Sequence, residues 1–174
     1  MKPPHRELLL LRHAKSDWKT PVDSDFERPL SKRGKRDAPR VGEWLHRQGL
    51  LPDRVISSPA ARAHRTADKA CKVLGIEENH IHWEPQIYDA DIRALLNVLA
   101  TCPQQFQRVL LTGHNPGLEG LLIYLCGSML EHPADGKLLP TATVARIRMP
   151  LDWQSLPADA GHLLSLTRPV EMDK

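Results

Sequence analysis

The sequence has few of the residues that crosslink secreted domains or bind structural metals. It contains three cysteines in 174 residues, Cys71, Cys102 and Cys126, and none of them forms a CxxC pair. An odd and widely spaced set argues against a disulfide framework and against a structural zinc site. We therefore expect Cys71 and Cys126 to be small core residues, which is how free cysteines usually behave.

Long apolar runs and aromatic residues are also scarce. No run approaches the roughly 20 residues that cross a bilayer. The four leucines Leu8–Leu11 are too few for the apolar centre of a signal peptide. We therefore expect a cytoplasmic protein without a membrane partner. Aromatic residues make up only 5% of the chain and do not interleave with a basic stripe, so we expect no nucleic-acid partner.

The composition is that of an ordinary soluble globular protein, with 41% hydrophobic and 26% charged residues. We expect residues 1–174 to form a single domain with its core at about residues 7–168, and the protein to be a monomer. The net charge of +3 is unevenly spread. Residues 1–72 carry 17 Lys and Arg against 9 Asp and Glu, a balance of +8, whereas residues 73–174 carry 7 against 12, a balance of −5. The basic half indicates an anionic partner, such as a phosphate group.

Short apolar runs alternate with helical patterns along the chain. The predicted strands are residues 7–12, 54–58, 80–83 and 108–113, followed by two segments of alternating polarity at 142–149 and 161–167. The predicted helices are residues 31–47, residues 58–74 and two leucine-rich segments around Ile92–Leu99 and Leu118–Leu125. This alternation predicts an α/β fold, a three-layer αβα sandwich around a mixed, mostly parallel sheet.

Two helix boundaries are suggested by local residue chemistry. Ser58 and Pro59 form an N-cap and first-turn pair for the second helix, and Gly75 ends it. Gly34 and Pro39 interrupt the first helical pattern, so we expect that helix to kink or to start late, near Pro39.

Polar residues gather where three of the predicted strands end. Arg12, His13 and Lys15 follow the first strand. Arg62 lies on the first turn of the helix after the second strand, and His114 directly follows the fourth. Because ligands bind beyond the carboxyl ends of parallel strands, we expect these side chains to share one rim. The guanidinium groups match phosphate oxygens, and neighbouring cations lower the pKa of His13, which keeps its imidazole neutral and nucleophilic.

Three segments of the chain carry a family resemblance. LLLLRHAKS, ISSPAARAHRTA and LLTGHNPGL resemble, in order and placement, the signature segments of the histidine phosphatase superfamily, which also contains the cofactor-dependent phosphoglycerate mutases. The similarity covers about Leu8 to Ile147 and is nearest to the small phosphohistidine phosphatases of the SixA type. It implies a phosphoglycerate mutase-like fold and a reaction that needs no metal and no other cofactor.

The resemblance also implies roles for individual residues. His13 would be the nucleophile that becomes phosphorylated. Arg12 and Arg62 would clamp the phosphoryl oxygens, and His114 would be the second phosphate-binding histidine. Lys15 either contributes to phosphate binding or only lines the loop.

The sequence departs from the family pattern at two places. Ala14 stands where the family usually has glycine, a change that we expect to be tolerated if the backbone there keeps a negative φ. The general acid is not clear: Asp89 gives the best match, with Glu84 and Asp91 as alternatives. A phosphoramidate needs less help from an acid than a phosphate ester does, because its imidazole leaving group is a good one.

The segment after the third strand is short, with room between residues 88 and 107 for one helix and a turn. Larger relatives carry an elaborate cap there, so an uncapped rim would admit a protein-borne phosphoryl group. We therefore expect a metal-independent phosphatase that acts, through a phosphohistidine enzyme intermediate, on phosphohistidine in a protein. The alternatives are a phosphatase of small phosphate esters or sugar phosphates, and a non-catalytic phosphate-binding adaptor domain.

Overall fold

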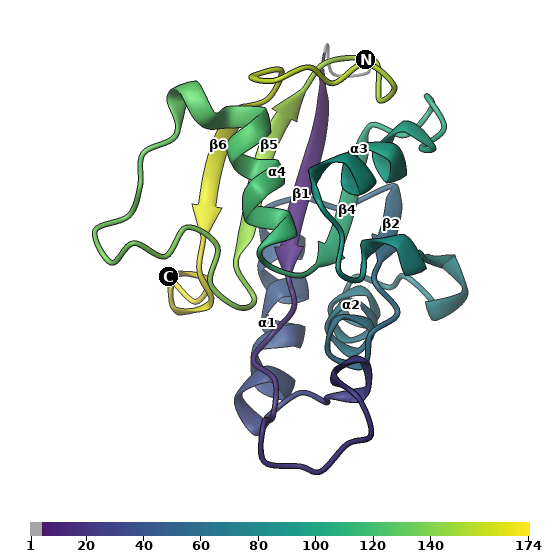
Figure 1. Cartoon of the computed structure of the whole chain (residues 1–174), viewed down its shortest axis with the longest axis vertical. Helices are drawn as coiled ribbons and strands as arrows, with labels where there is room; N and C mark the ends of the chain where they lie inside the picture. The colour runs from purple at the N-terminus through teal and green to yellow at the C-terminus, as the bar shows by residue number, and fades with distance from the viewer. Residues whose placement is uncertain (1–4) are drawn as a thin grey trace.

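A computed structural model describes residues 5–174 and shows a six-stranded sheet with helices on both faces (Figure 1). The strands are β1 (Arg6–Arg12), β2 (Arg54–Ser57), β3 (Ile81–Trp83), β4 (Arg108–Gly113), β5 (Val144–Met149) and β6 (His162–Thr167). The helices are α1 (Lys32–Arg47), α2 (Ala61–Val73), α3 (Ile92–Ala100) and α4 (Gly117–Cys126). The strand order is β3-β2-β4-β1-β5-β6. Strands β3, β2, β4 and β1 are parallel, whereas β5 pairs antiparallel with both β1 and β6. The predicted α/β class and the mixed, mostly parallel sheet are confirmed.

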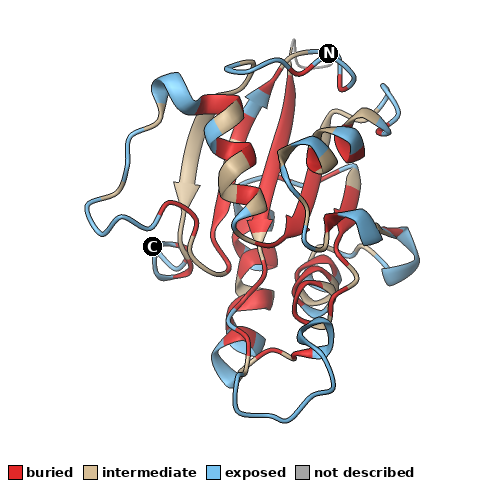
Figure 2. Cartoon of the chain, viewed as in Figure 1, coloured by how far each residue is buried: buried red, intermediate tan, exposed pale blue. Residues whose placement is uncertain are grey.

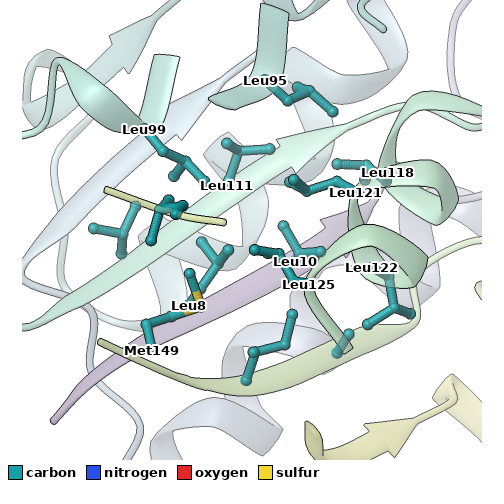
Figure 3. Packing of buried hydrophobic residues seen from close by; sticks show 14 of the residues in the cluster. Leu8, Leu10, Leu95, Leu99, Leu111, Leu118, Leu121, Leu122, Leu125 and Met149 are labelled. Carbon is teal, nitrogen blue, oxygen red and sulfur yellow. The ribbon is translucent and has the colours of Figure 1, made fainter. Parts of the chain in front are cut away.

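The leucines of β1 explain why this strand lies inside the sheet. Alternate side chains of a strand point to opposite faces. Leu8 and Leu10 pack with the leucines of α3 and α4 (Figure 3), whereas Leu9 and Leu11 pack with α1 on the other face. All four are fully buried, and each buried leucine contributes roughly 1.5–3 kcal/mol. Figure 2 shows the strands β1 and β4 as buried and the loop that follows β1 as largely exposed.

The register of the parallel strands brings their carboxyl ends together. Arg12 of β1 pairs with Gly113 of β4, so the residues that follow these strands leave the sheet side by side. Ser57 of β2 pairs with Thr112 of β4, which places the start of the next loop at the same edge. The three loops that carry the predicted chemistry therefore begin at one edge of the sheet, as expected.

Helix α1 begins at Lys32, so the expected late start near Pro39 is wrong. The Ser31 side chain caps the helix by accepting a hydrogen bond of 3.1 Å from the Gly34 N–H. Gly34 also has a packing role, because a Cβ at this position would lie 2.1 Å from the Lys15 carbonyl oxygen. The helix continues through Pro39.

Helix α2 begins at Ala61 with Ala60 at the N-cap, so Ser58 is not the cap that the sequence suggested. The Ser58 hydroxyl instead accepts a hydrogen bond of 3.2 Å from the Ala60 N–H within the preceding turn. The predicted end of the helix is confirmed, since Gly75 adopts a φ of 73° directly after the C-cap.

The cysteines are free and buried, as expected for core residues. Burial raises the pKa of the Cys71 thiol to about 12. Within residues 5–174, no helix combines the length and apolar character that crossing a bilayer requires. The single-domain organisation and the monomeric state stay predictions.

Candidate active site

The structure brings together four of the residues that the sequence singled out. Arg12, His13, Arg62 and His114 come from β1, the loop after it, the first turn of α2 and the loop after β4. The imidazole rings of His13 and His114 are 5.3 Å apart between their centroids. Both arginines lie close enough to lower the pKa values of both histidines. The expected convergence at the strand ends is therefore present.

His13 is held in one orientation by its own backbone neighbours. The backbone N–H of His13 donates to the Gly113 carbonyl oxygen at 3.0 Å. Its Nδ1 lies 2.8 Å from the Ala14 carbonyl oxygen, and because a carbonyl only accepts, Nδ1 must carry the ring proton. The lone pair is then on Nε2, which has no hydrogen-bond partner among residues 5–174. This tautomer is the one that a nucleophilic imidazole needs.

The pKa of His13 is lowered to about 3, mainly because the ring is buried. His114, Arg62 and Arg12 add smaller contributions of the same sign, opposed by the hydrogen bond to Ala14. The sequence analysis attributed the neutral imidazole to neighbouring cations, whereas burial is the larger cause. His13 is therefore neutral at physiological pH.

His114 is oriented by the hydroxyl of Ser58, which lies 2.8 Å from its Nε2. The same hydroxyl accepts from the Ala60 N–H, and because a hydroxyl can donate as well as accept, we assign its own proton to the bond with Nε2. The ring proton of His114 is then on Nδ1, a buried atom without a partner in the described chain. Burial, followed by the charge of Arg62, lowers the pKa of His114 to about 4. His114 thus offers one neutral N–H donor.

Both arginines also keep a buried nitrogen without a partner in the described chain. The Nη1 of Arg12 donates to the Leu139 carbonyl oxygen at 3.2 Å, but its Nε has no partner. The Nε of Arg62 is likewise buried and unpaired. Buried polar groups without partners are uncommon in folded proteins and call for an explanation. These two donors and His114 Nδ1 belong to three residues that all lie near enough to His13 to affect its pKa, and an oxyanion would satisfy such a set.

Within residues 5–174, five other buried side-chain atoms also lack partners. They are the Nε atoms of Arg6 and Arg54, the hydroxyls of Thr112 and Thr143, and Oδ1 of Asn115. The guanidinium of Arg6 lies 5.6 Å from the centroid of the Trp153 ring, and that of Arg54 lies 5.5 Å from the Phe106 ring. These two cations therefore have aromatic faces in place of an anion.

Ala14 takes the place of the glycine without strain. The residues other than glycine with a positive φ are Asp89, Ala142 and Asp159, so Ala14 keeps the negative φ on which the expected tolerance depends. Its N–H donates to the Thr66 hydroxyl at 3.0 Å, and that hydroxyl donates to the Arg62 carbonyl oxygen at 2.7 Å. Thr66 therefore joins the His13 loop to the start of α2.

The remaining predicted residues lie outside this set of contacts. Asp89 is exposed, has a φ of 55° and forms no hydrogen bond or ion pair in the described part of the chain. It directly follows Tyr88, whose ring centroid lies 5.5 Å from that of His114, so the chain passes near the site at this point. Glu84 caps the turn Pro85–Ile87 by accepting from the Gln86 N–H.

Asp91 and Lys15 also have structural contacts. Asp91 caps α3 by accepting a hydrogen bond of 2.8 Å from the Ala94 N–H. The Lys15 side chain is exposed, while its carbonyl oxygen accepts from both the N–H and the hydroxyl of Ser31. Lys15 therefore links the His13 loop to the start of α1.

The sequence analysis missed three residues beside Arg62. Asp25, Arg28 and Tyr88 form a hydrogen-bonded group with it, in which the Asp25 carboxylate accepts from all three partners. Asp25 lies in a polar loop with no periodicity, and Tyr88 is 63 positions away along the chain. No local sequence pattern predicts that these residues meet, although a basic residue in that loop was a weak indication of a role at the site.

In residues 5–174, no three His, Cys, Asp or Glu side chains are grouped as a metal site requires.

This chain resembles known proteins in both sequence and structure. Residues 8–92 match the histidine phosphatase superfamily, branch 1. An uncharacterized chloroplastic protein of Arabidopsis thaliana is 32% identical over 134 residues, which are 72% of this chain and 62% of that protein. The chain thus spans less than two thirds of that relative.

Two solved structures are similar over nearly their whole length. The first is named as a candidate phosphohistidine phosphatase SixA from Agrobacterium tumefaciens, with 28% identity, a TM-score of 0.78, and coverage of 94% of this chain and 99% of that one. The second carries the same name and comes from Nakamurella multipartita, with 25% identity, a TM-score of 0.79, and coverage of 98% and 99%. The expected phosphoglycerate mutase-like fold is confirmed.

Proposed function

Because residues 8–92 match the histidine phosphatase superfamily, we propose that the chain belongs to it and is a phosphatase that uses His13 as its nucleophile and needs no metal. The observation that carries this proposal is that Arg12, Arg62 and His114, three neighbours of His13, each keep a buried side-chain nitrogen without a partner: Arg12 Nε, Arg62 Nε and His114 Nδ1. Such donors stabilise the charge on the equatorial oxygens of a phosphoryl group during transfer, which is the main catalytic task in this chemistry.

The reaction has two steps. In the first, the Nε2 lone pair of His13 attacks phosphorus in line, a P–N bond forms, and the bond to the leaving group breaks with its electron pair going to the leaving group. That group takes a proton from water or from an acid at the rim. In the second step, water attacks phosphorus, the P–N bond to His13 breaks, and inorganic phosphate leaves. The Nδ1–H of His13 stays bonded to the Ala14 carbonyl throughout.

The substrate that we propose is phosphohistidine on a protein. Three features support it: the resemblance to SixA-type enzymes, the open rim and the lack of an obvious acid. Only α3 and its short flanking turns lie between β3 and β4, so no cap is built there. The loop after β1 also presents exposed apolar side chains, with Trp18, Val22 and Phe26 exposed by 73%, 41% and 37%. A large partner could cover such side chains, whereas a small ester could not.

The decisive experiment traps the intermediate. The enzyme is mixed with a phosphohistidine-bearing protein, quenched in base to preserve phosphohistidine, and digested to find which side chain carries phosphorus. We expect label on His13 and none in His13→Ala. Vanadate, which mimics the transferring group, should inhibit, while EDTA should not. Full activity of His13→Ala on an aryl phosphate would refute the proposal.

A phosphatase of small phosphate esters or sugar phosphates is the second candidate, and it is supported by an exposed carboxylate, Asp89, directly after Tyr88, which contacts His114. An alkoxide leaving group needs a proton more than imidazole does. Asp89→Asn should therefore slow ester hydrolysis more than phosphohistidine hydrolysis if Asp89 is the acid. Equal effects on both would remove Asp89 from proton transfer. The relative kcat/KM values of the two substrate classes would then decide between the candidates.

The adaptor alternative predicts phosphate binding without turnover, and the trapping experiment also tests it. A cytoplasmic location, the absence of nucleic-acid partners and the absence of a cofactor remain part of this proposal.

A further inference from the structure

Asp25 lies where a substrate anion would be expected to meet Arg62. It belongs to the 3₁₀ turn Asp25–Glu27 in the loop after β1 (Figure 1). The Nη2 of Arg62 donates to Asp25 Oδ2 at 2.9 Å, and Nη1 donates to the Asp25 carbonyl oxygen at 2.7 Å. One N–H of each terminal amino group of Arg62 is therefore bonded to Asp25, and Nε is a buried nitrogen without a partner in the described chain.

The Asp25 carboxylate is itself fixed from two further directions. Tyr88 donates its hydroxyl proton to Oδ2 at 2.9 Å, and Arg28 donates to Oδ1 from Nε at 3.1 Å and from Nη2 at 3.0 Å. The third nitrogen of Arg28 donates to the Ser16 hydroxyl, and its guanidinium lies 3.7 Å from the centroid of the Trp18 ring. Each guanidinium nitrogen of Arg28 thus has a protein partner, so Arg28 is held in place and anchors Asp25.

Asp25 is ionised at any pH at which the enzyme would work. Burial raises the pKa of its carboxyl, but the hydrogen bonds from Tyr88 and Arg28 and the charge of Arg62 outweigh burial and lower it to about 2. A group with so low a pKa is a poor general acid near neutral pH. Its negative charge also reduces the local positive charge of Arg12, Arg28 and Arg62, which leaves a balance suited to a phosphoryl dianion.

We propose that Asp25 is a positioning residue that acts through Arg62, by holding the two terminal amino groups so that the Nε edge faces the transferring phosphoryl group. The inference rests on the proposed function, because it assigns a geometry to the same site. A guanidinium presents its donors in a rigid plane, so fixing two nitrogens also fixes the third. In the absence of Asp25, Arg62 would turn its terminal fork toward any anion or toward solvent.

A double-mutant cycle tests this inference. Asp25→Asn removes the charge and keeps the size, Arg62→Ala removes the group through which Asp25 is proposed to act, and the double variant combines them. We expect Asp25→Asn to lower kcat/KM for an aryl phosphate roughly 10- to 100-fold in the wild-type background, as misplacement of a catalytic group does. In the Arg62→Ala background the same change should have less than about a twofold effect, because coupled residues are not additive.

The loop offers a matched control. Asp23 is an exposed carboxylate two positions away, so Asp23→Asn makes the same change of charge without touching Arg62. It should leave kcat/KM unchanged in both backgrounds. Equal losses from Asp25→Asn with and without Arg62 would mean that Asp25 only supports the fold, and would overturn the inference. A gain in vanadate affinity in Asp25→Asn would also overturn it, because Asp25 would then be a competing anion.

A second pair of variants keeps the test decisive if Asp25→Asn does not fold. Tyr88→Phe removes one hydrogen bond to Asp25 while retaining the ring beside His114, and its smaller loss should also vanish in the Arg62→Ala background. Vanadate affinity, measured by calorimetry on all variants, gives a readout that does not need turnover. If the enzyme proves inactive but the vanadate cycle is non-additive, the proposed function fails and this inference stands.

Discussion

Two carboxylates lie between pairs of guanidinium groups at opposite ends of β1. The two groups differ in whether a buried guanidinium nitrogen is left without a hydrogen-bond partner. At the amino end, Glu7 accepts from Arg108 Nε at 2.9 Å and from Arg146 Nη2 at 2.6 Å. Nη1 of Arg108 is directed at the carbonyl oxygens of Gly49 and Leu51. Neither arginine keeps a buried nitrogen without a partner. This end is closed.

At the carboxyl end, Asp25 plays the same part between Arg28 and Arg62, but Arg62 keeps its Nε buried and unpaired. Burial raises the pKa of Glu7 and of Asp25, and in each case the arginines outweigh it and lower the pKa. Both carboxylates are therefore stabilised in their charged form by arginines. The difference is the unpaired Nε of Arg62, which has no counterpart at Arg108 or Arg146. We interpret the closed group as structural and the open group as a site for an anion.

The strongest test of this comparison replaces one arginine at each end by lysine. Arg62→Lys keeps the charge but loses the planar fork that reaches Asp25 and the phosphoryl group together. We expect kcat/KM to fall about 100-fold or more, the scale of losing one transition-state donor. Arg146→Lys should leave kcat/KM within about twofold and reduce stability instead. Steady-state kinetics and urea unfolding of both variants measure the two effects. Similar activity losses in the two variants would end the distinction.

Glu7→Gln tests the closed end from the side of the carboxylate. It leaves two arginines without their counter-charge next to a nearly buried side chain, since only 9% of the Glu7 side chain is exposed. Breaking a fully buried pair costs 3–5 kcal/mol. Because Arg108 and Arg146 are 26% and 33% exposed, we expect a smaller loss, about 2 kcal/mol in the free energy of unfolding. Urea denaturation measures it. The folded variant should keep its kcat.

The sequence predicted the open end better than the closed one. Arg12 ends a strand, His13 and His114 follow strands and Arg62 lies on the first turn of a helix, and parallel strands bring such positions together whatever the details of packing. Asp25, Arg28 and Tyr88 could not be predicted in this way, because their meeting depends on the path of an irregular loop. The early start of α1 escaped prediction for a similar reason. Local propensity penalises Gly34, yet the close approach to the Lys15 carbonyl requires it.

The two ends should also respond differently to pH. The pKa values of His13 and His114 are lowered to about 3 and about 4, against about 6.5 in the unfolded chain. As pH falls from about 6.5, the unfolded state binds protons that the folded state refuses, so stability falls toward pH 4. Each histidine adds a slope of at most about 1.4 kcal/mol per pH unit. Asp25 stays ionised in this window.

His13→Gln should therefore flatten the decline of unfolding free energy between pH 6.5 and pH 4, and His114→Gln should do the same. Both can be measured by urea unfolding at a series of pH values. Glu7→Gln should not flatten the curve in this range, because the pKa of Glu7 is lowered from a value that already lies below most of it. A His13→Gln curve parallel to the wild type would mean that His13 is not buried in its neutral form.

The smallest expected effect concerns the surface beside the open end. Lys32, Arg33, Lys35 and Arg36 are exposed on the first turns of α1, which pack against the Lys15 carbonyl in the loop after His13. Unlike the ion pairs at Glu7, Lys32 and Lys35 have no acidic partner in the described chain. The positive charge of these side chains can attract an acidic protein but contributes little to keeping it bound, because exposed charges are screened.

Lys32→Ser with Lys35→Ser should raise KM for a phosphohistidine protein about threefold at low salt and leave kcat unchanged. The difference should vanish near 0.5 M salt, and aryl phosphate should show none at any salt. An equal change for both substrates would mean that these lysines act on the phosphate site itself, and the surface would then give no support to a protein substrate.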